Sequence, residues 1–399
     1  MRINTYCFII LLIISFLFLS CDNGKSKNDI NENKTFAPLS KYYPNGTISV
    51  KKMKIYDDLF SSIIKKYNFN GSVLVALNGY IVYEYNKGYS NIQLKDELTD
   101  SSLFQIASIT KMFTASAILL LKQEGKLKLD DKVTKYIPSF KYPNITILQL
   151  LQHRSGLPKY EYLSDNVSNR EKGLSNMDVI NLLNCYYPPL NFTPGSNFLY
   201  SNTGYVVLAL IIEKVSGQKY SDFLSAKLFK PSEMNNTFVV DKLNGINKSR
   251  VTIGSRGNSQ RSSLWEHSIL DDVVGDKGIY STTRDLLNWY RSLSLGRILN
   301  DTNINLMLTF NKSKPNSVRA YGLGIRWKNI DGRDFIYHNG RWNGYRSAYV
   351  YRPDTKLLVI ALSNTAHSAP RIATNIIDLY DKKVGKLKIN SKEGEEEKD

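Results

Sequence analysis

Residues 103–115 read LFQIASITKMFTA, and they place a serine and a lysine three positions apart at the start of an apolar run. The apolar residues after Lys111 recur at close to helical spacing, which predicts a buried helix. If Ser108 opens that helix, Lys111 lies one turn further along the same face. An amine in a poorly solvated cleft can accept the proton of a serine hydroxyl, and a helix N-terminus places a backbone N–H where an oxyanion develops. Ser108 and Lys111 are therefore a candidate nucleophile and base, although the same spacing occurs at Ser49, Ser62 and Ser216.

Length and composition bound the class of protein. The 399 residues include 42% hydrophobic residues, 26 tyrosines and 16 phenylalanines, enough for one large two-lobed unit or two domains. The net charge of +17 is compatible with nucleic-acid binding, but the lysines are dispersed and no basic run is interleaved with aromatic residues. We interpret the charge as a solvated lysine-rich surface and predict no nucleic-acid partner. A basic surface facing anionic envelope polymers or lipid headgroups stays open.

The first 50 residues are interpreted as targeting and tether segments. Residues 1–21 have one charge, an apolar run and a final Ser20-Cys21, which is typical of a secretory signal. Residues 18–21 resemble a lipobox, so we predict lipidation at Cys21, export, and a lipid anchor at a membrane of the bacterial cell envelope. An ordinary signal peptide or an uncleaved anchor is the alternative. Residues 22–50 are polar and predicted to be a flexible tether, and Cys185 is then a lone cysteine, predicted to be a small core residue.

The pattern of the remaining chain predicts an α/β (α+β) fold with strands at both ends. Two strands joined by Asn78-Gly79 form a strong hairpin signal. A mostly helical middle and a second group of strands follow, so one antiparallel sheet is built from both chain ends, with a helical lobe inserted and a cleft between the lobes. The predicted domain covers residues 51–385, and residues 386–399 are a charged tail predicted to be disordered. The strands are predicted at 72–77, 80–85, 321–327, 335–338, 346–351 and 357–363, and helices at 56–67, 146–153, 177–183, 204–215, 220–229 and 371–380.

Two further motifs carry chemistry. Residues 193–205 read TPGSNFLYSNTGY and present the phenol of Tyr200 and the amide of Asn202 on one side of a tight loop. A tyrosine beside an ammonium can share a proton with serine, whereas the plainer interpretation is a loop-capping aromatic with an Asx turn. Residues 337–341 read YHNGR and end a predicted strand, where Gly340 would admit a substrate backbone and the N–H of Arg341 could be an oxyanion donor. A strand-end His338 before a glycine turn is the structural alternative, and His153 in LLQHRSGLP (150–158) is interpreted as structural.

Taken in order, Ser-x-x-Lys, Tyr-x-Asn and His-x-Gly resemble the serine β-lactamase-related superfamily. The branch is the one that contains class C β-lactamases, D-Ala-D-Ala carboxypeptidases and lactamase-like esterases, and it implies the two-lobe β-lactamase/transpeptidase-like fold. The resemblance covers roughly residues 69–379. It includes LDDKV (129–133), YIP (136–138), SGLP (155–158), GIYSTTRDL (278–286) and YGLG (321–324).

The resemblance implies a role for each motif residue. Ser108 would form an acyl-enzyme, while Lys111 and Tyr200 share proton transfer, with the base left open between them. Asn202 would hydrogen-bond Lys111 and the substrate amide, and the backbone N–H groups of Ser108 and Arg341 would form the oxyanion hole. No metal or cofactor is implied, and the chain lacks the Gly-x-Ser-x-Gly elbow of a Ser-His-Asp hydrolase.

One departure from the family pattern bears on the substrate. Lactam-hydrolysing class C enzymes have Lys-Thr-Gly where this chain has His338-Asn339-Gly340, and histidine is a cation only below its pKa near 6.5. Arg341 or Arg346 would then have to supply the missing charge. We therefore predict a serine hydrolase of the D-Ala-D-Ala carboxypeptidase or penicillin-binding type, acting on a small-molecule or peptide substrate, with peptidoglycan as a possible partner. The alternatives are a small-molecule esterase, a β-lactamase, and an inactive homologue that binds peptidoglycan or a partner protein.

Overall fold

The computed structural model describes residues 37–44, 50–164, 173–257, 261–312 and 317–393. The predicted signal peptide, the lipobox with Cys21 and most of the tether lie outside the described residues. Within the described ranges, no helix has both the length and the apolar character needed to cross a membrane.

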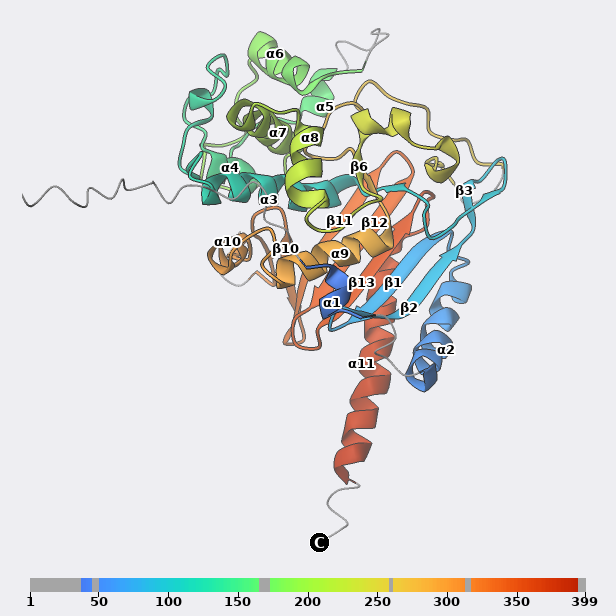
Figure 1. Ribbon diagram of the computed structural model, residues 1–399. Coiled ribbons are helices and arrows are strands. Elements are labelled where there is room, and N and C mark those ends of the chain that lie inside the picture. The colour runs from blue at the N-terminus through green and yellow to red at the C-terminus, as the bar shows by residue number, and fades with distance from the viewer. Residues whose placement is uncertain (1–36, 45–49, 165–172, 258–260, 313–316, 394–399) are drawn as a thin grey trace, which may run out of the picture. The chain divides into compact units, whose positions relative to one another are not determined.

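An eight-stranded sheet is built from both ends of the chain, as predicted (Figure 1). Its order is β2-β1-β13-β12-β11-β10-β9-β8, and every neighbouring pair is antiparallel. Asn78 and Gly79 both have positive φ, 51° and 81°, which matches the two-residue hairpin turn expected between the first two strands. The strands are β1 (Gly71–Leu77), β2 (Tyr80–Lys87), β8 (Asn311–Lys312), β9 (Arg319–Tyr321), β10 (Arg326–Ile330), β11 (Arg333–Trp342), β12 (Tyr345–Arg352) and β13 (Leu357–Ser363).

Helices cover both faces of this sheet. On one face, α2 (Val50–Lys66) and α11 (Ala369–Glu393) pack together, and their apolar residues share a core with the sheet residues that point toward them. On the other face, α9 (Thr283–Ser294) lies across β1 and β13 (Figure 1). The strands β1 and β13, which lie between these helices, are consequently buried on both sides, and every residue of β13 is buried.

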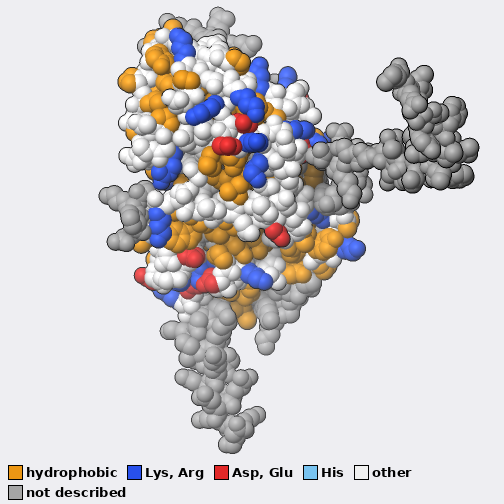
Figure 2. Space-filling view, turned by 90° about the vertical axis from the view of Figure 1, so that its left-hand side faces the viewer, with side chains coloured by type: hydrophobic (Ala, Val, Ile, Leu, Met, Phe, Trp, Pro, Cys, Tyr) orange, Lys and Arg blue, Asp and Glu red, His pale blue; other side chains and the backbone are white. Residues whose placement is uncertain are grey.

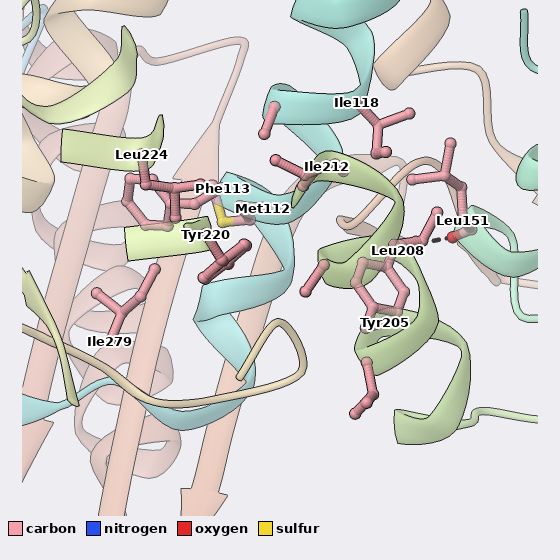
Figure 3. Close-up of a cluster of buried hydrophobic side chains, with 14 of the residues drawn as sticks. Met112, Phe113, Ile118, Leu151, Tyr205, Leu208, Ile212, Tyr220, Leu224 and Ile279 are labelled. Carbon is pink, nitrogen blue, oxygen red and sulfur yellow. Dashed lines mark hydrogen bonds between the residues drawn. The ribbon is translucent and has the colours of Figure 1, made fainter. Parts of the chain in front are cut away.

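The inserted lobe is held together by α3 (Thr110–Gln123) and α7 (Asn202–Ser216). Figure 3 shows Ile118 on the side of α3 that faces Leu208 and Ile212 of α7, and Phe113 on the side toward Leu224 of the neighbouring helix. On α7, the Tyr205 hydroxyl donates to the carbonyl of Leu151. The other helices of α type are α1 (Leu39–Tyr42), α4 (Ile147–Leu151), α5 (Tyr160–Leu163), α6 (Asn176–Tyr186), α8 (Tyr220–Leu224) and α10 (Asp301–Met307).

A small antiparallel sheet joins this lobe to the rest of the domain. It has the order β5-β7-β6, from Phe104–Gln105, Ile279–Ser281 and Phe238–Val239. Because β5 leads directly into residues 107–109, the pairing of β5 with β7 brings residues near 276 to the serine of the first motif. A separate pair is formed by β3 (Tyr89–Asn91) and β4 (Asp96–Glu97).

Three sequence-based boundaries were wrong. Residues 37–44 are not tether: Leu39 is buried, its N–H donates to Glu233, and Arg297 donates to the carbonyl of Ala37. At the other end, α11 continues to Glu393, into the segment predicted as a disordered tail. The strand predicted over 321–327 is two strands, β9 and β10, because the turn between them packs against α3.

Two predictions about the surface have different outcomes. Cys185 was expected in the core but is exposed at the end of α6. Figure 2 shows Lys and Arg side chains spread over the visible face among uncharged ones, without one continuous basic stripe. This dispersion agrees with interpreting the charge as a solvated surface.

Candidate active site

Ser108 lies in a tight turn that leads directly into α3. Residues Ala107–Ile109 form a 3-10 turn, and Ala107 has a φ of 48°, in the left-handed region that residues with a Cβ rarely adopt. Such backbone strain costs on the order of 1–3 kcal/mol and is typical of functional sites. As predicted, Lys111 lies one turn further on the same face, with its Nζ 3.1 Å from the Oγ of Ser108.

The amino group of Lys111 is buried and is held by a second contact. Its side chain is fully buried, and Nζ donates to the backbone carbonyl of Asp276 at 2.8 Å. The Asp276 carboxylate lies instead against Lys277 and accepts from the hydroxyl of Tyr160. Lys111 is thus aimed at Ser108 by a neutral carbonyl, and within the described residues no carboxylate lies within ion-pair distance of it.

Tyr200 lies between Lys111, Arg326 and a buried histidine. The Nζ of Lys111 is 5.1 Å from the centroid of the Tyr200 ring. The guanidinium of Arg326, on β10, is 4.6 Å from the same centroid. Behind the ring, His153 packs at 4.2 Å between ring centroids and accepts the N–H of Ser201 on Nδ1. Burial, and then Lys111, lower the pKa of His153 well below 6.5, so this ring is a neutral support for the tyrosine.

Asn202 does not make the contact expected of it. Its Nδ2 donates to Glu161 at 2.6 Å, while Lys111 donates to Ser108 and Asp276 and makes no hydrogen bond to Asn202 in the described structure. The Oδ1 of Asn202 is buried and has no hydrogen-bond partner among the described residues. The amide therefore retains a free acceptor, but the predicted Asn202–Lys111 bond is absent because Glu161 orients the side chain.

His338 is a buried neutral residue rather than an accessible cation. It is fully buried, with Nδ1 2.9 Å from the carbonyl of Asn339 and Nε2 3.2 Å from the hydroxyl of Tyr321. These partners assign the proton to Nδ1 and leave Nε2 as an acceptor. Burial, then Arg326 and Lys111, lower the pKa of His338 well below 6.5. The positive charge at this end of the site belongs to Arg326.

Replacing His338 with glutamine is expected to flatten the pH dependence of unfolding. The folded-state pKa is lowered, so as the pH falls below 6.5 the unfolded chain binds the proton first. The stability that depends on neutral His338 is therefore present above pH 6.5 and lost on acidification. Urea midpoints at pH 7.5 and 6.0 should differ more in the wild type than in the His338→Gln variant.

His267→Gln is the matched control, since that side chain is exposed beside Asp272. Burial raises the pKa of Asp285 to about 6, which works in the opposite sense but equally in all three proteins. An identical pH dependence in the wild type and His338→Gln would contradict the assignment of a neutral buried histidine.

The far half of β11 offers an open strand edge beside Ser108. The pairing of β10 with β11 ends at Arg326 and Tyr337, so residues 338–342 pair only with β12. Gly340 is on this stretch, and a Cβ there would lie 2.1 Å from the Oγ of Ser347 and 2.3 Å from the carbonyl of Ile106. Gly340 was expected to admit the substrate backbone; the structure shows that it admits the turn that carries Ser108.

We expect Gly340→Ala to lower activity by about 10²-fold, since a misplacement of about 1 Å at a reacting group has that cost. Overpacking of this kind also destabilises a fold by about 1–3 kcal/mol. The measurements are turnover and the melting temperature. Gly245→Ala is the control, because a Cβ there meets nothing within 4 Å. Wild-type turnover in Gly340→Ala would show that the close approach of β11 does not position Ser108.

The structure adds two residues that the sequence did not indicate. Arg326 approaches Tyr200 from β10, and Asp276 orients Lys111 through its backbone carbonyl from a site 165 positions away in the chain. Arg326 lies just after the YGLG stretch, and this proximity to a recognised motif is the only feature of the sequence that could have indicated a place in the site. Nothing in the sequence distinguishes the carbonyl of Asp276.

The sheet with an inserted helical lobe, and a Ser-Lys-Tyr cluster between them, define the β-lactamase/transpeptidase-like class of fold. The family model described as Beta-lactamase matches residues 57–380, and the chain belongs to that family of penicillin-binding-like serine hydrolases.

Among curated proteins, the chain is similar to Penicillin-binding protein 4* of Bacillus subtilis, with 32% identity over 78% of this chain and 72% of the relative. It is 29% identical to protein flp of Staphylococcus aureus over 73% of this chain, but it covers only 59% of that relative.

Solved structures of other proteins share this fold. A penicillin-binding protein from Bacillus halodurans matches with a TM-score of 0.71 and 25% identity, over 80% of this chain and 98% of that one. A D-amino acid amidase from Ochrobactrum anthropi also has a TM-score of 0.71, over 82% of this chain and 99% of that one; at 23% identity it supports the fold alone.

Proposed function

We propose that the chain hydrolyses D-amino-acid peptides or amides through an acyl-enzyme on Ser108, in the manner of a D-Ala-D-Ala carboxypeptidase. The observation that carries this is the 3.1 Å contact between Lys111 Nζ and Ser108 Oγ, beside an open strand edge. The name of the curated relative, penicillin-binding protein, supports this class of substrate.

In this mechanism Ser108 loses its proton to Lys111 or Tyr200 as Oγ bonds to the substrate carbonyl carbon. The oxyanion accepts hydrogen bonds from the backbone N–H groups of Ser108 and Arg341, as the family resemblance implies. Collapse of this intermediate breaks the C–N bond, and the proton taken from Ser108 passes through Tyr200 to the leaving amine. A water then hydrolyses the acyl-enzyme by the reverse proton path and restores Ser108.

Arg326 supplies a fixed charge at the leaving-group end. A D-amino-acid leaving group carries a free carboxylate, and Arg326 is a permanent cation beside Tyr200. Neutral His338 cannot perform this role at pH 7. This favours a peptidase whose leaving group is anionic, while a small-molecule esterase or a β-lactamase would use the same nucleophile.

Intact-mass spectrometry of the domain from residue 37 onward tests the proposal. The protein is incubated separately with a penicillin, an acyl-D-Ala-D-Ala peptide and a short-chain activated ester. A stable penicillin adduct on Ser108 with release of D-alanine from the peptide supports the peptidase. Fast ester turnover without a penicillin adduct would indicate an esterase, and rapid penicillin turnover a β-lactamase. A folded protein that gives neither adduct nor turnover would point to an inactive binding homologue.

We also propose export and lipid attachment at Cys21, with peptidoglycan as the polymer within reach. This rests on the sequence pattern of residues 1–21. Incorporation of labelled palmitate in the bacterial host, lost in Cys21→Ser, is the expected result. Equal labelling of both forms would contradict the anchor.

A further inference from the structure

A hollow of about 480 Å³ lies at the turn between β11 and β12, beyond the proposed oxyanion donor Arg341. The turn contributes Arg341, Trp342, Asn343 and Arg346 to its wall, and the loop before β7 contributes Arg256 and Trp265. Three guanidinium groups and two indoles therefore surround one concave space that the mechanism above does not use.

The arginines of this hollow are not neutralised by the protein. None of Arg256, Arg341 and Arg346 has a carboxylate within ion-pair distance among the described residues. The nearby carboxylate of Asp271 is already engaged, because it accepts from the indole N–H of Trp342 and from the amide of Asn343.

Two of these arginines, Arg341 and Arg346, lie directly opposite each other on neighbouring strands. Arg341 and Arg346 are direct partners in the register of β11 and β12, an arrangement in which like charges destabilise a sheet. Burial, and then Arg341, lower the pKa of Arg346. Arg256 is held by stacking on Trp265, 4.3 Å from guanidinium to ring centroid. A bound anion would relieve this repulsion.

The direction of the substrate places its acyl part toward the hollow. Tyr200 and Arg326 lie at the His338 end of the open edge, and the leaving group must be there to receive the proton of Tyr200. An extended substrate along residues 338–342 then sends its acyl chain toward Trp342. At about 3.3 Å per residue, the hollow begins about two residues from the scissile bond.

We propose that this hollow, the arginine pocket, binds a carboxylate on the acyl part of the substrate. The proposal rests on the proposed function and specifies its substrate class: acyl groups with a negative charge about two residues from the scissile carbonyl. Guanidinium groups pair with carboxylates in a bidentate, charge-assisted manner, and the indoles of Trp265 and Trp342 provide apolar walls for the stem that carries the carboxylate.

Two esters that share one leaving group and differ only in acyl charge test the pocket. The acyl groups are succinyl-D-alanyl and its neutral analogue succinamoyl-D-alanyl, in which an amide replaces the carboxylate. The expected kcat/KM is about ten- to a hundredfold higher for the carboxylate form, the range of a hydrogen bond to a charged group. The preference should fall toward one in Arg256→Gln and Arg346→Gln and persist in Arg319→Gln, an exposed arginine on β9 outside the pocket. If Arg346→Gln does not fold, Arg256→Gln alone decides, because that side chain is exposed.

The outcomes separate this inference from the proposed function. Turnover of both esters at equal kcat/KM in the wild type would overturn the arginine pocket and leave the hydrolase intact. If neither ester is turned over, the proposed function fails, and tryptophan fluorescence is titrated with free succinyl-D-alanine and its succinamoyl analogue. A saturable change with the carboxylate alone, lost in Arg256→Gln, would still support the pocket. No saturable change, or tighter binding of inorganic phosphate than of the carboxylate, would overturn it.

Discussion

The Ser108→Ala variant is expected to lose turnover of every accepted ester or amide by on the order of 10⁴–10⁶-fold, the range seen when a nucleophile that acts in a unit is removed. The reason is chemical, because the change removes one oxygen at a half-buried position and leaves the alanine methyl in place. The melting temperature should therefore stay close to that of the wild type. Active-site titration with a penicillin should show no adduct.

Ser116→Ala is the matched control for this variant. Ser116 is also on α3 and is buried, and its Oγ donates to the sulfur of Met307 at 3.9 Å, away from Ser108. It should keep wild-type turnover. Residual activity of Ser108→Ala above about 1% of wild type would mean that another residue attacks the substrate.

The second large effect is expected at Lys111. Lys111→Ala should slow acylation by about 10²–10⁴-fold, the usual contribution of a positioned base, because the Nζ that faces Ser108 is removed. The expected change is in the acylation rate measured by stopped-flow with a chromogenic ester. Circular dichroism and thermal melting verify that the protein folds, since the change also leaves the carbonyl of Asp276 without its donor.

Lys122→Ala is the control on the same helix. Its ammonium contacts Asn303 at 3.1 Å, away from Ser108. Near-normal acylation in a folded Lys111→Ala would make Tyr200 the sufficient base. A loss equal to that of Ser108→Ala would instead show that the two side chains act as one unit.

The parts of the fold predicted correctly are those with a strong local signal. The hairpin at Asn78-Gly79 follows from two residues that tolerate positive φ, and the buried strand 357–363 follows from seven consecutive residues of apolar or small character. The split of residues 321–327 into two strands could not be predicted this way. Gly324 has a φ of 74°, and its position is set by the carbonyl of Lys111, 2.4 Å from where a Cβ would be. That contact exists only in the folded protein.

The predicted end of the tether was wrong for a related reason. Residues 22–50 are polar on average, but within them the buried Leu39 and two hydrogen bonds to Glu233 and Arg297 hold residues 37–44 on the domain. Composition gives only the average polarity of a segment. Whether these residues pack on the domain is decided by one buried leucine and by hydrogen bonds to Glu233 and Arg297, which are far away in the chain. Cys185 shows the converse: its type favours burial, and its place at the end of α6 exposes it.

The sequence by itself determined the family, the two-ended sheet and the Ser108–Lys111 pair, because a spacing of three residues in a helical turn makes those two side chains neighbours wherever the helix lies. Only the tertiary structure decided the charges around that pair. It buried His338 as a neutral ring, turned Asn202 toward Glu161, and brought Arg326 to Tyr200. The physical reason is that desolvation and Coulomb interactions depend on distances in space, and residues far apart in the chain reach those distances only when the sheet and the inserted lobe have packed.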